Sequence, residues 1–476
     1  MSRRLALGFD SSTQSVKVEA RDVATGEVVA HASAKHPATA PPVSEQWPAS
    51  WWSALTSACS DLGDARADVV AISVAGQQHG LVLLDDAGEA VRPAKLWNDT
   101  TSAPQTERLI AELGAARWTE LTGSVPVPSF TVTKLAWVAE HEPQALSRAT
   151  RVMLPHDYLT WRLTGRHVTD RSDASGTGWF DPVGNRSARE LVSLAAPDWP
   201  GELPRVLLPA EPAGELTSAA ARELGLPAGI PVGPGAGDNA AAALGLGLQP
   251  GDVAVSLGTS GVVFAVSPTP TRDPEGWVAG FASASGSFLP LVCTLNATKV
   301  TDTVAAWLGV DAAGLAELAL AADSSGDAPV LVPYFDGERT PNLPDATGTW
   351  FGLTNTVTRA QLARAAHDGV LCALLDGLDH LRSCGATAAG RMFLVGGGSR
   401  SPAYRHRLAD LAGQDVIIPD TDETVATGAA VQAAVVAGAG SFADVAAQWQ
   451  LGVGRTVAPE SDGAAVRARY TSATGG

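Results

Sequence analysis

Two short segments, each a polar turn between apolar strands, occur half a chain apart and resemble each other. The first is Leu7–Val18 and the second is Val255–Phe264. Their alignment pairs like residues, Thr13 with Thr259 and Val16 with Val262. Such hairpin turns can surround phosphate oxygens with backbone N–H groups and hydroxyls. Because one copy opens each half of the chain, the pair predicts two related domains with a nucleotide between them.

The composition indicates a globular protein that binds neither nucleic acid nor an anionic membrane. The chain has 476 residues, 45% of them hydrophobic and 17% charged, which suits two large domains or three small ones. Its formal net charge of −17 opposes association with polyanions. ATP is still a suitable ligand, because backbone dipoles and a metal ion capture phosphate locally.

Cysteine spacing and apolar runs favour a cytoplasmic location. Four widely spaced cysteines without a CxxC pair are expected to be buried, reduced thiols: Cys59, Cys293, Cys372 and Cys384. The apolar run Leu5–Phe9 is too short for a signal peptide. The run Val425–Gly440 is rich in alanine and glycine and contains Gln432, so we expect a buried helix rather than a membrane span.

Both halves of the chain show the alternation of strands and helices that is typical of an α/β protein. In the first half, Val69–Val74 has the continuous apolar composition of a buried parallel strand. In the second half, residues 391–419 read as strand, glycine-rich loop, helix and strand, which predicts a parallel crossover. We expect the boundary after an alanine-rich helix, which divides the chain into domains 1–245 and 246–476.

Asp10 ends the first strand of the first hairpin and has two interpretations. An aspartate before a turn commonly bonds its own backbone. Alternatively, its carboxylate orients a hydrated Mg²⁺ ion beside nucleotide phosphates. The second hairpin favours the metal role. Because Ser256 takes the place of Asp10 in that copy, only the first copy brings a carboxylate to a metal.

Asp238 lies in the glycine-rich segment Gly235–Ala241, just ahead of the second hairpin. It could be a simple helix N-cap, but the neighbouring glycines leave space and exposed backbone that a cap does not need. A carboxylate at a helix N-terminus is expected to stay ionised. It would then orient a substrate hydroxyl that attacks a γ-phosphate and finally take its proton, which leaves late in a loose transition state.

Three turns rich in glycine and hydroxyl side chains are candidates for binding the nucleotide. Two are the hairpin turns, and the third precedes a helix and is a candidate seat for the adenosine. Ordinary strand-to-helix turns share this composition, and a Walker lysine is absent, so the third turn alone is a weak signal. The candidates are Ser11, Ser12, Thr13 and Gln14, then Gly258, Thr259 and Ser260, then Gly396, Gly397, Gly398 and Ser399.

Polar and aromatic residues in two other turns suit a substrate with many hydroxyl groups. Gln78 and His79 lie between glycines, and Trp97 begins a second polar turn that ends at Asp99. A lone histidine is more often a satisfied hydrogen-bonding group, so this alternative stays open for His79. Simpler roles are expected for three further residues: turn capping for Asp170 and Asp173, and solvation for Lys17.

These motifs together resemble the FGGY family of carbohydrate kinases over essentially the whole chain. The matching segments, in family order, are Leu7–Ser15, Gly76–Gly80, Leu96–Thr100, Leu154–Leu159, Thr169–Thr177, Gly235–Ala241, Ser256–Gly261 and Gly396–Ser399. A central signature is also matched, by Ser129, Thr131, Lys134, Leu135, Trp137, Val138, Glu140 and His141.

The resemblance implies two actin-like, ribonuclease-H-like ATPase domains that close over an interdomain cleft, and a homodimer is common in the family. It implies phosphorylation of D-xylulose at its 5-hydroxyl by MgATP. Asp238 would be the proton acceptor, Asp10 would lie near the metal and phosphates, and Gln78 and His79 would contact the sugar. Two positions depart from the family pattern: Gln78 stands where methionine is common, and His367 where an apolar residue is expected.

Two alternative functions stay open. A sister kinase would act on ribulose, gluconate, glycerol or another polyol, because a few hydroxyl contacts decide the choice of sugar. An actin-like ATPase would turn over the nucleotide without any sugar substrate.

Overall fold

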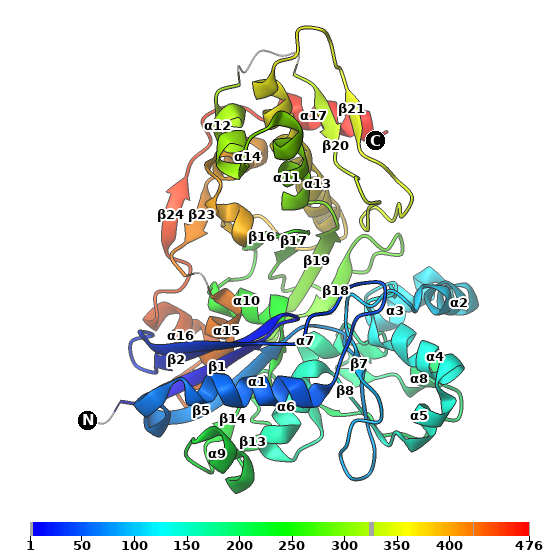
Figure 1. Ribbon diagram of the computed structural model, residues 1–476, viewed down its shortest axis with the longest axis vertical. Helices are drawn as coiled ribbons and strands as arrows, with labels where there is room; N and C mark the ends of the chain where they lie inside the picture. The colour runs from blue at the N-terminus through cyan, green and yellow to red at the C-terminus, as the bar shows by residue number, and fades with distance from the viewer. Residues whose placement is uncertain (1–2, 323–327, 422, 476) are drawn as a thin grey trace.

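Two seven-stranded sheets, one in each lobe, organise the chain (Figure 1). The computed structural model describes residues 3–322, 328–421 and 423–475. The first sheet has the order β13-β14-β5-β1-β2-β3, with β15 beside β5. Its strands are β1 (Leu5–Ser11), β2 (Ser15–Asp22), β3 (Val28–Lys35), β5 (Val69–Gly76), β13 (Gly214–Glu215), β14 (Pro231–Val232) and β15 (Ala236–Gly237).

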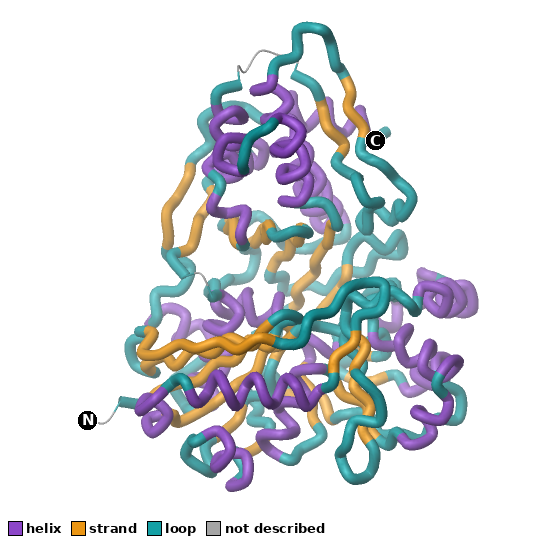
Figure 2. The backbone as a smooth tube through the Cα atoms, in the orientation of Figure 1, coloured by secondary structure: helices purple, strands orange, loops and turns teal. Residues whose placement is uncertain are grey.

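The second sheet has the order β18-β19-β17-β16-β22-β23-β24. Its strands are β16 (Val253–Leu257), β17 (Gly261–Ala265), β18 (Ala279–Ala282), β19 (Phe288–Thr294), β22 (Met392–Val395), β23 (Val416–Pro419) and β24 (Gly454–Val457). Smaller strand pairs lie outside the two sheets, as the tube drawing shows (Figure 2). They are formed by β4 (Glu45–Gln46), β6 (Val82–Leu84), β7 (Ala94–Lys95), β8 (Arg151–Met153), β9 (Val168–Asp170), β10 (Phe180–Asp181), β11 (Arg186–Ser187), β12 (Arg205–Leu207), β20 (Val330–Val332) and β21 (Thr349–Phe351).

The two sheets repeat one topology. In the first, β1, β2 and β3 form an antiparallel meander and β5 runs parallel to β1. In the second, β16, β17 and β19 form the same meander and β22 runs parallel to β16. The predicted crossover is also present, because β22 and β23 are parallel and α14 (Pro402–Ala412) joins them. The predicted α/β repeat is confirmed.

The two hairpins differ by one residue in their turns. Ser11 pairs with Val16 in the first hairpin, whereas Leu257, which aligns with Ser11, pairs with Gly261 in the second. The second turn is therefore one residue shorter. The predicted match of Val16 with Val262 is wrong by one position, because valines follow both turns and the sequence does not reveal the shift.

Helices α10 (Asp238–Gly245) and α15 (Thr424–Val436) pack against each other at the junction of the lobes (Figure 1). α15 comes from the second half, yet it packs on β1 and β5, where Val431 shares a core with Ala6 and Ala71. α10 shares a core with Phe264 and Phe393 of the second sheet. The apolar run at 425–440 is thus a buried helix over most of its length, as expected. The domain boundary after residue 245 stays a prediction.

Glycines permit this close packing. At three glycines, an added Cβ atom would lie far inside van der Waals contact with a backbone oxygen. The distance would be 2.1 Å to Ala426 O at Gly8, 1.9 Å to Thr424 O at Gly245, and 1.8 Å to Ala241 O at Gly428. Any side chain at these positions would collide with backbone that cannot move without shifting a helix.

The remaining helices pack on the sheets or on one another. In the first half they are α1 (Pro48–Ser60), α2 (Ala103–Leu113), α3 (Ala115–Thr122), α4 (Thr131–His141), α5 (Pro143–Arg148), α6 (Pro155–Thr164), α7 (Arg171–Ala174), α8 (Arg189–Ala195) and α9 (Ser218–Leu224). In the second half they are α11 (Thr298–Leu308), α12 (Ala312–Leu320), α13 (Arg359–Ser383), α16 (Phe442–Gln448) and α17 (Ala464–Thr474). For example, α1 packs on β2 and β3, whereas α2 packs on α4. No single described helix is long and apolar enough to span a membrane, and α11 and α12 pass that test only as a pair bent by 88°.

The cysteines are unpaired, as predicted, but only two are buried. Cys59 and Cys372 lie in the cores, whereas Cys293 and Cys384 are partly exposed. The unexpected His367 is a core residue of α13. Its Nδ1 atom is 2.9 Å from the carbonyl oxygen of Ala363, and its ring meets that of Tyr404 edge to face.

Candidate active site

Asp10 lies at the end of β1 with a buried carboxylate. Its Oδ1 atom and the hydroxyl of Ser11 have no hydrogen-bond partner among the described residues. Burial raises the pKa of Asp10 to about 7, with a contribution from the charge of Asp238 and opposition from Lys17. Buried, unpartnered oxygens of this kind suit a hard divalent cation, which would favour the ionised carboxylate. The residues present therefore fit the predicted metal site.

Lys17 is not simply solvated, contrary to expectation. It faces Asp10 across the β1–β2 ladder, and its Nζ atom lies 2.7 Å from Glu423 Oε2, just before α15. Both side chains border a hollow of about 970 Å³ lined by both halves of the chain. The lysine thus links the first hairpin to the second half. The sequence did not predict this ion pair, because its two residues are 406 positions apart.

Asp238 is the first residue of α10 rather than its N-cap, a position that Gly237 holds. Its Oδ1 atom accepts hydrogen bonds from the backbone N and from Nδ2 of Asn239, at 2.7 and 2.9 Å. Burial nevertheless raises the pKa of Asp238 to about 6, and these two bonds only partly oppose the shift. A pKa of about 6 still leaves the carboxylate mostly ionised at neutral pH, and the rise from 3.8 arises because the loss of water outweighs the stabilisation by hydrogen bonds.

Gln78 is joined to the same group. Asn239 Nδ2 also donates to Gln78 Oε1 at 3.0 Å. The Gln78 side chain lies against Gly237, where a Cβ atom would approach its Nε2 to 2.5 Å. The structure therefore brings together Gln78 and Asp238, which were predicted from segments 160 residues apart in the sequence, through the side chain of Asn239.

His79 is buried in a strained turn, with φ of +67°. Its ring contacts Phe130 and Phe281, with centroids 5.1 and 5.4 Å away. Burial lowers its pKa well below 6.5, and the charges of Arg339 and Lys134 add to the effect. The imidazole is therefore neutral at neutral pH, and its Nδ1 atom has no hydrogen-bond partner among the described residues.

Asp173 does not cap a turn. Its fully buried carboxylate accepts a hydrogen bond from the backbone N of His79 at 3.2 Å. Asp170 does act as predicted, because it caps α7 by accepting from the backbone N of Ser172 and of Asp173.

Trp97 contacts the turn of the first hairpin. Its Nε1 atom donates to Thr13 Oγ1 at 2.9 Å, and the same hydroxyl donates to Gln77 Oε1 at 3.1 Å. Asp99, which the sequence grouped with Trp97, is buried away from the cleft. It pairs with Lys95 at 3.1 Å and has a pKa lowered, against the effect of burial, by hydrogen bonds and this lysine. Of the two, only Trp97 is exposed, whereas Asp99 is fully buried.

The second hairpin and the third glycine-rich turn lie together. Cβ atoms at Gly396 and Gly398 would approach Leu257 at the tip of β16 to 2.6 Å. Thr259 and Ser260 are exposed in the hairpin turn, and residues 397–400 form a single 3₁₀ turn before α14. The two turns predicted to bind the nucleotide are therefore contiguous, and their role stays a prediction.

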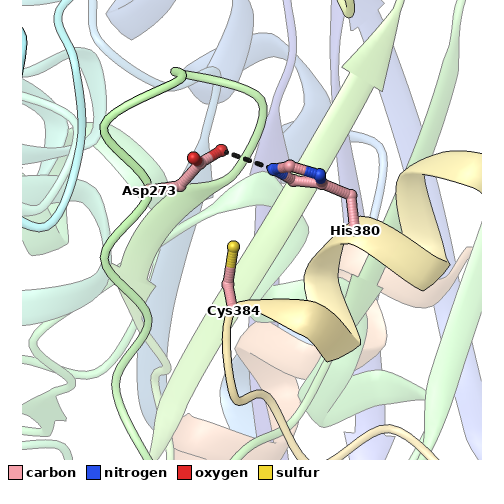
Figure 3. A group of neighbouring side chains, drawn as sticks. All are labelled: Asp273, His380 and Cys384. Carbon is pink, nitrogen blue, oxygen red and sulfur yellow. Dashed lines mark hydrogen bonds and ion pairs between the residues drawn. The ribbon is translucent and has the colours of Figure 1, made fainter. Parts of the chain in front are cut away.

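A second group with metal-binding side chains lies outside the cleft, at Asp273, His380 and Cys384 (Figure 3). The Asp273 carboxylate is already saturated. It accepts from the backbone N atoms of Glu275, Trp277 and Val278 and lies 3.1 Å from His380 Nε2. A metal ion would have to displace these donors. The contact between Asp273 and His380 instead holds the loop 273–278 against α13.

Sequence reasoning missed two residues near the proposed site, Asn239 and Arg339. Asn239 was inside a recognised motif, but its bridge between two other side chains needed the fold. Arg339 follows β20 in the second half. Its Nη2 atom lies 3.5 Å from Ser129 Oγ in the first half, and its charge acts on His79. No local pattern marks such an arginine, since its neighbours are distant in sequence.

Comparisons with known proteins agree with this geometry. Residues 5–245 match the N-terminal domain of the FGGY family of carbohydrate kinases, and residues 253–437 match its C-terminal domain. The chain is 48% identical to the xylulose kinase of Streptomyces rubiginosus over 451 residues, 94% of this chain and 92% of that protein. It is 40% identical to the xylulose kinase of Escherichia coli over 418 residues, 86% and 85% of the two chains.

A solved structure gives the same result. The crystal structure of xylulose kinase from Bifidobacterium adolescentis matches with a TM-score of 0.90 and 43% identity, over 99% of both chains. The predicted two-domain, actin-like fold is confirmed. The chain belongs to the FGGY family of carbohydrate kinases.

Proposed function

We propose that this FGGY carbohydrate kinase transfers the γ-phosphoryl group of ATP to the 5-hydroxyl of D-xylulose, giving D-xylulose 5-phosphate and ADP. The family, and the relatives named xylulose kinases that match most of the chain, support this activity. The observation that carries the mechanism is Asp238, which is held by Asn239 and linked to Gln78 at the cleft.

Asp238 is the proposed proton acceptor. Its pKa of about 6 leaves it mostly ionised at neutral pH, and it is basic enough to accept the hydroxyl proton as that proton leaves. Asn239 fixes one carboxylate oxygen, so the other is available to the sugar. Gln78 and the neutral imidazole of His79 supply hydrogen-bonding groups for other sugar hydroxyls. Trp97 completes the proposed sugar site with an aromatic surface.

Asp10 is the proposed ligand of Mg²⁺. The ion, when bound, neutralises charge on the phosphates and favours ionised Asp10. The turn residues Ser11 to Gln14 and Gly258 to Ser260 bind the phosphates through N–H groups and hydroxyls, and Gly396 to Ser399 border the adenosine. Positioning and electrostatic stabilisation supply most of the rate, with water excluded as the lobes close. We further propose that the enzyme is cytoplasmic and forms a homodimer. Sedimentation of the purified protein tests the oligomeric state.

A panel of sugars tests the proposal. ADP release is measured by a coupled assay with ATP and Mg²⁺, without sugar and with D-xylulose, ribulose, gluconate and glycerol, and compared by kcat/KM. We expect D-xylulose to have the highest ratio and sugar-free turnover to be slow. A higher ratio for another sugar would reassign the substrate within the family. Turnover indifferent to every sugar would contradict the kinase mechanism itself.

A further inference from the structure

A buried histidine lies directly behind the proposed sugar site. His156 is the second residue of α6, and its side chain is fully buried. Its Nε2 atom lies 3.3 Å from Asp157 Oδ1, 3.2 Å from Asp170 Oδ1 and 3.5 Å from Asp173 Oδ2. None of the three carboxylates is more than 4% exposed. One imidazole thus stands among three buried acids.

This cluster is held together by charge. Burial alone would lower the pKa of His156, but the surrounding carboxylates outweigh it and raise the pKa to about 9. The cluster therefore favours the protonated ring, while burial and repulsion between the acids raise the pKa of Asp157 to about 6 and that of Asp173 well above 3.8. Removing His156 would take away the cation that contacts all three carboxylates in this buried region, where mutual repulsion and the cost of burial would push them apart or protonate them.

The cluster is connected to the turn that carries His79. Asp173 uses its Oδ1 atom to accept from the backbone N of His79, at 3.2 Å, and its Oδ2 atom faces His156. The turn needs such a restraint, because φ of +67° is unfavourable for a side chain larger than glycine. Gly176 packs directly against the His79 ring, because a Cβ atom at Gly176 would lie 1.9 Å from that ring.

The cluster is also connected to the strand that leads into Asp238. Asp170 accepts from Ser172 Oγ at 2.5 Å, and that hydroxyl is the acceptor for the backbone N of Gly237 at 3.2 Å. The His156 ring itself lies against this segment, because a Cβ atom at Gly235 would approach its Nδ1 to 2.5 Å. Both walls of the proposed sugar site therefore rest on the same group of side chains.

We propose that His156 is a positioning residue for the sugar. Its ring holds the Asp170 and Asp173 side chains together, and these two side chains set the distance between the His79 turn and the Gly237–Asp238 segment. The residue contacts neither sugar nor nucleotide. The inference rests on the proposed function, because it concerns the sugar site of that reaction.

Two substitutions at this position separate charge from shape. His156→Gln keeps a polar side chain but removes the cation, and His156→Lys keeps a cation. For His156→Gln we expect the KM for D-xylulose to rise by about tenfold or more while the KM for ATP stays within about twofold. His156→Lys should recover a large part of the sugar KM. His367→Gln is the matched control, since His367 is equally buried but lies in the core of the second half.

A milder variant covers the case in which His156→Gln does not fold. Ser172→Ala cuts only the connection between Asp170 and Gly237, so we expect a folded protein whose KM for D-xylulose rises several-fold with the KM for ATP unchanged. Circular dichroism and thermal unfolding establish the folded fraction of each variant. Equal rises in the KM for D-xylulose and the KM for ATP would show a merely structural role. So would a rise in the KM for D-xylulose no greater than that of His367→Gln.

The outcomes distinguish this inference from the proposed function. If the wild-type protein phosphorylates no sugar, the proposed function fails. If the wild-type protein phosphorylates D-xylulose and folded His156→Gln and Ser172→Ala keep its KM, only the role of His156 fails. Failure of His156→Lys to improve on His156→Gln would overturn the argument from charge.

Discussion

Gln78 Oε1 accepts a hydrogen bond from Asn239 Nδ2 at 3.0 Å. Since Asn239 follows Asp238 in the chain, one side chain separates the proposed sugar contact from the proposed base. The same Nδ2 group donates to Asp238 Oδ1 at 2.9 Å. A change at Gln78 therefore acts on the orientation of Asn239 as well as on the sugar.

The first prediction concerns this bond. Gln78→Met restores the residue that is common in the family pattern and removes the acceptor for Asn239. We expect the KM for D-xylulose to change by roughly two- to tenfold while kcat stays within about threefold, because the base itself is untouched. Steady-state kinetics with saturating ATP measure both constants. A large loss of kcat with an unchanged KM would show that Gln78 acts on the chemical step.

The second prediction concerns the base. Asp238→Asn keeps the shape of the side chain but cannot accept a proton, so we expect kcat for D-xylulose to fall by about 10²–10⁴-fold. Binding of ATP, measured by calorimetry without sugar, should be retained. Near-normal turnover would mean that Asp238 only supports the start of α10.

The third prediction concerns pH. Because burial raises the pKa of Asp238 to about 6, and the base must be ionised to act, kcat/KM for the sugar should fall as the pH drops below about 6. The profile is measured between pH 5 and 8 at saturating MgATP, where the metal keeps Asp10 ionised. A rate independent of pH down to 5 would contradict either the assignment or the raised pKa.

The fourth prediction concerns stability without ligands. The pKa of Asp10 is raised from 3.8 to about 7, chiefly by burial, so the folded protein binds its proton more tightly than the unfolded chain. The stability that this provides is complete below about pH 4 and is lost as the pH rises through 7. Asp10→Asn should therefore raise the melting temperature at pH 8, through a gain of roughly 1–4 kcal/mol, and much less at pH 5.

Exposed Asp86 provides the control for this experiment, because Asp86→Asn should leave the melting temperature unchanged at both pH values. Asp10→Asn should at the same time lose phosphoryl transfer. A variant at Asp10 that is less stable than the wild-type protein at pH 8 would show that its ionised carboxylate is well paired in the absence of metal.

The fifth prediction concerns the junction of the lobes. Gly428→Ala would place a Cβ atom 1.8 Å from Ala241 O, so α10 and α15 would have to separate. We expect a large fall in the melting temperature or loss of soluble protein. Gly314→Ala in α12 is the control, because its Cβ would meet a Val310 side-chain atom only at 3.2 Å, and alanine favours a helix. Equal stability of the two variants would contradict the tight crossing.

The fold was largely predictable because its signals are local. The hairpins at Asp10 and Ser256, the apolar strand at Val69–Val74 and the crossover at 391–419 each follow from short patterns of apolar residues and turn residues. The one-residue difference between the hairpins escaped prediction. Turn length depends on backbone pairing, and repeated valines mask the shift.

The site was predictable only in part. Glycine-rich turns and their polar neighbours predicted Asp10, Gln78, His79 and Asp238. The structure links Gln78 to Asp238 through Asn239 and brings Asp10 close enough to Asp238 for their charges to interact. Their environments did not follow from the sequence. The pKa of Asp238, the pairing of Lys17 with Glu423 and the burial of Asp99 depend on groups that are distant along the chain.

The sequence by itself determined the two related α/β halves, the turns and the residue types that a phosphoryl transfer needs. Only the tertiary structure decided that a helix of each half crosses at the junction, and that His156 gathers three aspartates behind the sugar site. The physical reason is the distance along the chain over which each kind of interaction acts. Turn chemistry and hydrophobic periodicity act over a few residues, whereas burial and charge act through space, between atoms that the fold alone brings together.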